Sequence, residues 1–247
     1  MSAVLLITGG SAGIGAATAR AAATHGYSRV ILTYRSDAEG AAAVVGDLKR
    51  QGVDAFAVKA DVANHEDTDR LFNLLRTKAP APLHLVNNAG VVTPSGSVAD
   101  LTPDRVAQMF GINVFGLIEM SRQAVQYMRE TGLGGHIVNI SSIASRLGSA
   151  NMYIDYAASK GAVDTFTLGL ADELAPEGIR VNAIRPGLIE TEIHAKGGVP
   201  DRLEKIGKTP PLGRPGTADE IADAVMYLLS NRASYVTRSI LDVGGGR

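Results

Sequence analysis

Short runs of β-branched residues alternate with longer Ala- and Leu-rich stretches along almost the whole of this 247-residue chain. Alternation of strand-length and helix-length segments is typical of βαβ units, in which parallel strands form a sheet covered by helices on both faces. No shift in composition resembling a linker interrupts this pattern. We therefore predict an α/β fold with a single domain, residues 1–247, rather than two smaller domains.

The pattern predicts seven strands and six helical regions. The strands are Val4–Thr8, Arg29–Tyr34, Asp54–Lys59, His84–Asn87, His136–Ile140, Arg180–Ile184 and Ser239–Val243. The helices are Gly15–Thr24, Ala38–Gln51, Asn64–Thr77, Pro103–Arg129, Tyr156–Leu174 and Asp219–Ser230. A doubly wound parallel sheet of Rossmann type has this element order. The Gly- and Pro-rich segment 188–215 breaks the pattern, so we expect it to be an insertion that closes over the substrate.

Composition excludes several classes of function. Lys and Arg number 24 against 25 Asp and Glu, which leaves no basic field for nucleic acid. The absence of cysteine excludes disulfides and thiolate chemistry. No run approaches the roughly 20 apolar residues of a membrane span, and Ala3–Ile7 is too short for a signal peptide, so we expect a cytoplasmic protein with no membrane partner. The five histidines lack metal-ligand spacing, so we predict no metal site and expect solvated or strand-edge histidines.

A glycine-rich loop lies between the first predicted strand and the first helix, with the sequence Thr8-Gly-Gly-Ser-Ala-Gly-Ile-Gly15. Glycines allow a tight turn and let the backbone approach a pyrophosphate, whose charge is stabilised by unpaired N–H groups at a helix N-terminus. The loop is therefore predicted to bind a dinucleotide through Gly9, Ser11, Gly13, Ile14 and Gly15.

Tyr156 and Lys160 are four residues apart in a predicted helix, so their side chains share one face. A lysine ammonium roughly 4–6 Å from a phenol would favour the phenolate by about 3–4 kcal/mol at an effective dielectric constant of about 20. That would move a tyrosine pKa from about 10 toward about 7–8. The pair predicts a general acid/base at neutral pH. Tyr153 is the rival, but the residue four positions after it is the uncharged Ala157.

The chain resembles the short-chain dehydrogenase/reductase family over nearly its whole length. The resemblance rests on motifs in the family's order: Thr8–Gly15, Asp61-Val62, Asn87-Asn88-Ala89-Gly90, Asn113, Ser142, Tyr156-x-x-x-Lys160 and Pro186-Gly187. It implies an oxidoreductase that transfers a hydride between a nicotinamide cofactor and a carbonyl or alcohol. The spacing from Ser142 to Tyr156 is one position longer than in many relatives, so we expect a bulged loop between them.

The resemblance also implies catalytic roles. Tyr156 would be the acid/base, tuned by Lys160, and Ser142 would hold the substrate oxygen. Ser141 is the alternative, because both serines follow a strand whose carboxyl end is where such sheets bind ligands. Asn113 lies between two glycines inside a predicted helix, where asparagine is unfavourable, and a local kink around a bound water would explain it. By resemblance, its backbone carbonyl holds a water that links the lysine to solvent.

Further cofactor contacts follow from the resemblance. The pair Asp61-Val62 is similar to the residues that contact adenine, and the segment that includes Asn88, Ala89 and Gly90 is similar to the one that supports the sheet and the adenine-side ribose. Contacts around the nicotinamide are implied for Tyr156, Lys160, Pro186, Gly187, Ile189 and Thr191.

Charge at the end of the second strand predicts the choice of cofactor. Enzymes that prefer NAD usually place a carboxylate about 20 residues after the glycines, where it binds the ribose 2′-hydroxyl. Here these positions hold Tyr34, Arg35 and Ser36, and Arg35 could bind a 2′-phosphate through charge-assisted hydrogen bonds. We predict NADP(H) in preference to NAD(H). The alternative is that Arg35 is solvated and Asp37 turns back to the ribose.

The substrate is predicted only by class, as a small-molecule carbonyl or alcohol. Candidate pocket residues are mostly apolar: Ile143, Arg146, Met152, Tyr153, Leu188, Ile193 and His194. Arg146 could bind an anion, but an arginine in such a loop is more often a solvated cation. A non-catalytic regulator that senses NADP(H) on the same fold is the alternative function. Such a sensor would not require Asn113, Ser142, Tyr156 and Lys160 together.

A homotetramer is implied, because relatives of this size commonly pack their long helices and C-terminal strands in pairs. Small or apolar residues on the two long predicted helices agree with this expectation: Gly111, Val114, Gly116, Ala157, Ala158 and Ala162.

Overall fold

The computed structural model of the protein describes residues 3–191, 198 and 206–247. Seven parallel strands form one sheet in the order β3-β2-β1-β4-β5-β6-β7. Their bounds are β1 Val4–Ile7, β2 Arg29–Tyr34, β3 Asp54–Lys59, β4 Leu83–Asn87, β5 Gly135–Ile140, β6 Arg180–Pro186 and β7 Ile240–Val243. The strand order reverses between β1 and β4, which is where doubly wound sheets bind ligands at their carboxyl ends. The predicted fold class is confirmed.

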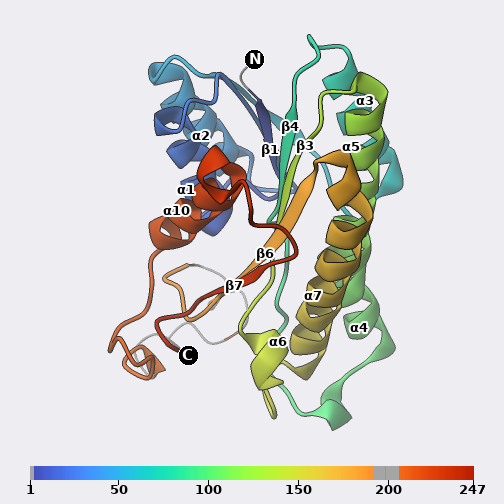
Figure 1. Cartoon of the computed structure of the whole chain (residues 1–247). Helices are drawn as coiled ribbons and strands as arrows, with labels where there is room; N and C mark the ends of the chain where they lie inside the picture. Colours follow the sequence, from blue (N-terminus) through green and yellow to red (C-terminus); the bar gives the residue numbers. More distant parts are fainter. Residues whose placement is uncertain (1–2, 192–197, 199–205) are drawn as a thin grey trace.

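Helices cover both faces of the sheet (Figure 1). One face carries α1 (Gly13–Thr24), α2 (Ala38–Arg50) and α10 (Ala218–Leu229), and the other carries α3 (His65–Arg76), α5 (Leu117–Thr131) and α7 (Ile154–Leu174). Successive strand residues point to opposite faces. In β1, Leu5 and Ile7 therefore join the first core, while Val4 and Leu6 join the second. Within the described ranges, no helix is long and apolar enough to cross a bilayer.

The predicted helix 103–129 is interrupted in the middle. It consists of α4 (Pro103–Phe110), the π-helical segment η2 (Gly111–Gly116) and α5. Gly116 allows η2 to pack closely, because a Cβ there would lie 2.7 Å from the side chain of Val62. Single π-helical turns are frequent at functional sites. The kink expected around Asn113 is therefore present as a widened helical turn.

The loop between Ser142 and α7, in which the sequence predicts a bulge, folds into a short helix and a left-handed turn. It contains the short helix α6 (Ala144–Leu147), after which Ser149 and Asn151 adopt positive φ angles of 50° and 58°. Left-handed conformations are uncommon for residues other than glycine. The described residues also include the short helices η1 (Val98–Asp100), η3 (Ala175–Glu177) and η4 (Asn231–Ala233).

Two of the histidines are not solvated or at strand edges, so that expectation was wrong for them. His84 and His136 are paired in register on β4 and β5, and their rings stack with centroids 4.7 Å apart. The Tyr27 hydroxyl is hydrogen-bonded to His84 Nδ1, and the buried Arg180 is close enough to act on both rings electrostatically. Burial first, and then the neighbouring positive charges, lower the pKa of His84 to about 3 and that of His136 to about 4.

This histidine pair should make the protein less stable in mild acid. Both groups have an ordinary pKa of 6.5, so below that pH the unfolded chain binds protons that the folded protein excludes. Above pH 6.5 both histidines are neutral in the folded and the unfolded chain, and they cost no stability. As the pH falls from 6.5 toward 4, each histidine lowers the free energy of unfolding, by roughly 1–2 kcal/mol at pH 5. Urea unfolding at pH 7 and pH 5 should show this decrease. The double variant His84→Gln/His136→Gln should lose most of it, whereas His65→Gln, at an exposed position, should not.

Candidate active site

A cleft of about 730 Å³ opens at the carboxyl ends of the strands. One end is lined by the residues that follow β2, including Arg35, and the other by Ser142, Tyr156 and Leu188. Parallel sheets of this topology present their loops, and so their ligand contacts, at this edge. The segments after β1, β2, β4, β5 and β6 all contribute to one continuous wall.

The glycine-rich loop has the conformation that its sequence requires. Gly9 and Gly13 have positive φ angles of 64° and 53°, which glycine adopts without strain. Ala12 is the N-cap of α1 and offers no side-chain cap, which leaves the first N–H groups of the helix available for an anion. These features fit a dinucleotide pyrophosphate.

Four of the five predicted loop residues line the cleft, namely Gly9, Ser11, Gly13 and Ile14. Gly15 does not, although we predicted a cofactor contact there. It packs behind the loop, where a Cβ would lie 2.2 Å from the carbonyl oxygen of Gly9. Its role in the structure is close packing of α1 against the loop.

The segment after β4 fixes the position of the glycine loop. Asn88 Nδ2 donates to the carbonyl oxygens of Thr8, at 2.9 Å, and of Gly9, at 2.8 Å. Thr8 Oγ1 accepts from the backbone N–H groups of Asn88 and Ala89, both at 2.9 Å. The remaining predicted residues of this region, Asp61, Val62, Ala89 and Gly90, line the cleft beside it.

The β2 end of the cleft carries one exposed arginine and one engaged carboxylate. Tyr34, Arg35, Ser36 and Asp37 all line the cleft. Asp37 is the N-cap of α2, and its Oδ1 accepts from the N–H of Gly40 at 2.9 Å. One carboxylate oxygen of Asp37 is therefore occupied in capping the helix.

The two serines after β5 differ in what their hydroxyl groups do. Ser141 is buried, and its Oγ donates to the carbonyl of Lys160 at 3.2 Å. Ser142 is half-buried, and its Oγ accepts from the N–H of Ala144 at 3.1 Å, which leaves the hydroxyl proton for another partner. Both line the cleft, but this difference favours Ser142 as the group that meets a ligand.

Tyr156 and Lys160 lie on one face of α7 and both line the cleft. Lys160 Nζ is 5.7 Å from the centre of the Tyr156 ring and donates to the carbonyl of Ile140 at 2.7 Å. Burial lowers the pKa of Lys160 to about 8, partly opposed by the negative charge of Asp164. The ammonium therefore keeps most of its charge at neutral pH and loses it above pH 8.

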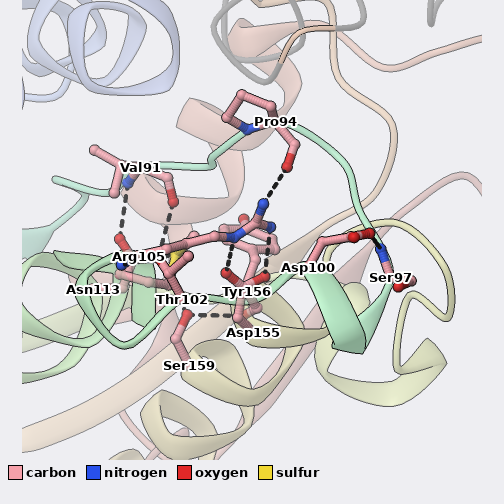
Figure 2. Close-up of polar contacts among 11 residues, drawn as sticks. Val91, Pro94, Ser97, Asp100, Thr102, Arg105, Asn113, Asp155, Tyr156 and Ser159 are labelled. Atoms are coloured by element: carbon pink, nitrogen blue, oxygen red, sulfur yellow. Dashed lines mark hydrogen bonds and ion pairs between the residues drawn. The ribbon is translucent and has the colours of Figure 1, made fainter. Parts of the chain in front are cut away.

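Asn113 does not line the cleft but lies buried behind it, where it joins two segments of the site (Figure 2). Its Oδ1 accepts from the N–H of Val91 at 2.8 Å, and its Nδ2 donates to the Val91 carbonyl at 3.0 Å. The same Nδ2 donates to Ser159 Oγ at 3.1 Å, which in turn donates to the Tyr156 carbonyl at 2.7 Å.

Most other predicted residues line the cleft, among them Pro186, Gly187, Ile189, Thr191, Ile143, Met152, Tyr153 and Leu188. Arg146 is not among the lining residues, which fits the alternative that it is a solvated loop cation. It is more than half exposed and forms an ion pair with Asp242. Ile193, His194 and residues 192–197 and 199–205 of the expected substrate-covering insertion lie outside the described residues.

Several lining residues were not predicted. Val91, Val92 and Leu147 add apolar surface, and Arg247 lines the cleft although it is the last residue of the chain. Arg247 reaches the site because the chain just before it packs closely against the residues after β6. The backbones of Gly187 and Gly244 are in contact, so that a Cβ on Gly187 would lie 2.5 Å from Gly244 Cα. No local pattern in the sequence signals this contact.

Comparisons with known proteins place the chain among oxidoreductases. The sequence profile described as Enoyl-(Acyl carrier protein) reductase matches residues 9–247. The chain is 44% identical over 247 residues to the uncharacterized oxidoreductase YgfF of Escherichia coli, covering 99% of this chain and 100% of that protein. It is 36% identical over 243 residues to 3beta-hydroxysteroid dehydrogenase 1 of Eggerthella lenta, covering 98% and 92% of the two chains.

Two solved structures are similar over almost their whole length. A short-chain dehydrogenase/reductase mutant from Serratia marcescens superposes with a TM-score of 0.89 at 31% identity, covering 99% of this chain and 97% of that one. A 3-ketoacyl-(acyl-carrier-protein) reductase from Brucella melitensis, complexed with NADH, also gives a TM-score of 0.89, at 33% identity, covering 99% and 98%.

Proposed function

Because the chain belongs to the short-chain dehydrogenase/reductase family, we propose that it is an NADP(H)-dependent oxidoreductase that interconverts a carbonyl and an alcohol. The observation that carries the proposal is the single cleft shared by the glycine loop, Arg35, Ser142, Tyr156 and Lys160. A dinucleotide-binding loop and a polar acid/base group must share one site for a hydride and a proton to reach the same carbonyl group.

The chemistry divides between the cofactor and the protein. When bound, the nicotinamide supplies or accepts the hydride. In the reducing direction the Tyr156 hydroxyl donates a proton to the substrate oxygen, and Ser142 Oγ donates a hydrogen bond that orients that oxygen. The Lys160 ammonium, 5.7 Å from the Tyr156 ring, favours the phenolate that remains after proton transfer. Asn113 fixes the position of α7 relative to the loop after β4.

Separate groups of residues would hold the parts of the dinucleotide. The first turn of α1 and the glycine loop suit the pyrophosphate, and Asp61 and Val62 suit the adenine. Arg35, an exposed cation that lines the cleft after β2, suits a 2′-phosphate. Pro186 to Thr191, together with Lys160, suit the nicotinamide end.

The described part of the substrate region is mostly apolar, formed by Val92, Ile143, Leu147, Met152, Tyr153 and Leu188. Apolar walls favour a carbonyl compound with a hydrocarbon body over a highly hydroxylated one, because burying hydroxyl groups without partners is unfavourable. We therefore propose an apolar or amphipathic ketone or aldehyde and its alcohol as the substrate class.

The test is turnover of a panel of aliphatic and cyclic carbonyls with NADPH and NADH, together with the corresponding alcohols and NADP⁺ and NAD⁺. We expect reduction of at least one apolar carbonyl with NADPH. Tight binding of NADPH without turnover of any panel member would overturn the enzymatic proposal and support a regulator that senses NADP(H).

We also propose a homotetramer. On the outer face of η2 and α5, Phe115 is 64% exposed, and Ile118 lies one turn along from it. On α10 and after η4, Tyr227 and Tyr235 are exposed as well. These two sets of exposed apolar side chains are candidates for the two kinds of interface that a tetramer requires. Val114, Gly116 and Ala157 of the expected helix faces are instead buried in the chain's own fold.

Replacing Phe115 and Ile118 together with aspartate should therefore break one interface and leave dimers. Light scattering should give about four times the 25.7 kDa chain mass for the wild type and half of that for the variant. Tyr235→Asp should act through the other patch. A wild-type protein that is monomeric at micromolar concentration would contradict the proposal.

A further inference from the structure

Arg105 of α4 joins two segments of the site that are far apart in the sequence (Figure 2). Its Nε and Nη2 donate to the two carboxylate oxygens of Asp155, at 2.8 and 3.1 Å. Its Nη1 donates to the backbone carbonyl of Pro94 at 2.6 Å. One guanidinium therefore binds both the segment after β4 and the second residue of α7.

This ion pair is largely removed from solvent. The side chain of Asp155 is 1% exposed and that of Arg105 is 16% exposed. Burial raises the pKa of the Asp155 carboxyl, but hydrogen bonds from Arg105 and from the N–H of Tyr156 outweigh this and hold it below its ordinary value. A buried carboxylate depends on such partners, so the geometry of the pair is strongly constrained. Only arginine offers the planar fork and a further donor at once.

Both ends of the connection lie next to functional atoms. Asp155 directly precedes Tyr156, which lines the cleft. At the other end, Pro94 belongs to the segment 91–97, whose Val91 and Val92 line the same cleft. The N–H of Gly96 in this segment donates to the carbonyl of Met152 at 2.9 Å.

We propose that Arg105 and Asp155 are positioning residues, which hold the segment 91–97 as the wall of the substrate pocket against the start of the helix that carries Tyr156. Asn113 holds the segment through hydrogen bonds to the backbone of Val91, and Arg105 holds it three residues later through a hydrogen bond to the carbonyl of Pro94. With both sets of hydrogen bonds in place, the distance between the pocket wall and the tyrosine hydroxyl is fixed. Catalysis is sensitive to this distance, because a misplacement of about 1 Å can cost up to 10²-fold in rate.

The proposal rests on the proposed carbonyl reduction and predicts a specific kinetic pattern. Asp155→Asn and Arg105→Gln should each lower kcat/KM for the carbonyl substrate roughly tenfold, within the range for misplaced reacting groups. The dissociation constant for NADPH should stay within about twofold, because neither residue lines the cleft. Arg105→Lys retains the charge but not the fork, and should recover only part of the loss.

A second readout does not depend on activity. Hydrogen exchange followed by mass spectrometry should show faster exchange of the peptide 91–97 in Asp155→Asn, while peptides from α3 and α5 are unchanged. The control is Glu130→Gln, which removes a carboxylate from an ion pair of the same hydrogen-bond distances. Glu130 accepts from Arg76 Nε and Nη2 at 2.8 and 3.1 Å, but this pair joins α3 to α5 and is more exposed, at 31% for Arg76 and 52% for Glu130. This variant should change neither the exchange of 91–97 nor kcat/KM.

Unchanged exchange of 91–97 in both Asp155→Asn and Arg105→Gln would overturn the proposal. So would faster exchange with a kcat/KM within twofold of wild type, or a loss of NADPH binding that parallels the loss of activity. If the wild type turned over no carbonyl, but exchange of 91–97 were still faster in Asp155→Asn than in wild type, the result would count against the proposed function and not against the positioning role of Arg105 and Asp155.

Discussion

Replacing Tyr156 with phenylalanine should lower turnover by at least ~10²-fold, which is the lower part of the range for general acid–base catalysis. The phenyl ring keeps the packing of α7 but removes the only proton-donating atom of this side chain. The affinity for NADPH, measured by fluorescence titration, should remain within a few-fold. A loss confined to kcat would indicate an interaction made in the transition state.

Tyr153 provides the matched control for this experiment. It also lines the cleft and is buried, but the residue four positions along is Ala157, whereas Tyr156 has Lys160. Tyr153→Phe should therefore act mainly on KM for the carbonyl and reduce kcat much less than Tyr156→Phe. Near-normal turnover by Tyr156→Phe, or a larger loss from Tyr153→Phe, would show that the acid/base has been assigned to the wrong residue.

Removing the Arg35 guanidinium should change the choice of cofactor. Hydrogen bonds to charged groups contribute about 1.5–3 kcal/mol, which corresponds to roughly 10- to 150-fold in kcat/KM for NADPH relative to NADH. Arg35→Ala should lose most of this preference because its kcat/KM for NADPH falls, while the value for NADH changes little. The measurement is kcat/KM with both cofactors at one saturating carbonyl concentration.

Arg50→Ala is the control for Arg35→Ala, because it also removes one arginine charge, from the helix that follows β2. Arg50 is exposed at the end of α2 and pairs with Asp47, so its loss should leave the cofactor preference unchanged. Asp37→Asn tests the alternative role of that carboxylate. A wild-type preference for NADH that Asp37→Asn abolishes would show that Asp37 binds the ribose and that Arg35 is only solvated.

Local patterns predicted the elements of this fold closely. The predicted bounds of β2 and β3 match the structure, and those of the other strands differ by one or two residues. Runs of β-branched residues define strands and glycines define turns within a few positions, so neighbouring residues carry this information. The glycine loop and the spacing of Tyr156 and Lys160 were predictable for the same reason, since both depend on residues within one helical turn or one tight loop.

The errors concern residues whose surroundings come from distant parts of the chain. His84 and His136 were expected to be solvated or at strand edges, but strand register places their rings against each other. For Arg146 the sequence left open a solvated cation or an anion-binding residue, and only the return of β7 to the sheet edge brings its partner Asp242 to it. Periodicity predicts that a residue lies on a strand or a loop, and it cannot predict which partner the neighbouring element presents.

The sequence by itself determined the doubly wound sheet, the tight turn of the glycine-rich loop and the placement of Tyr156 and Lys160 on one face of a helix. Only the tertiary structure decided what holds them in place. Arg105 and Asp155 are 50 positions apart, and Gly187 meets Gly244 only because β6 and β7 are neighbours in the sheet. The physical reason is that helical and strand periodicities are encoded over a few residues, whereas a buried ion pair or a close backbone contact exists only after the whole sheet has assembled.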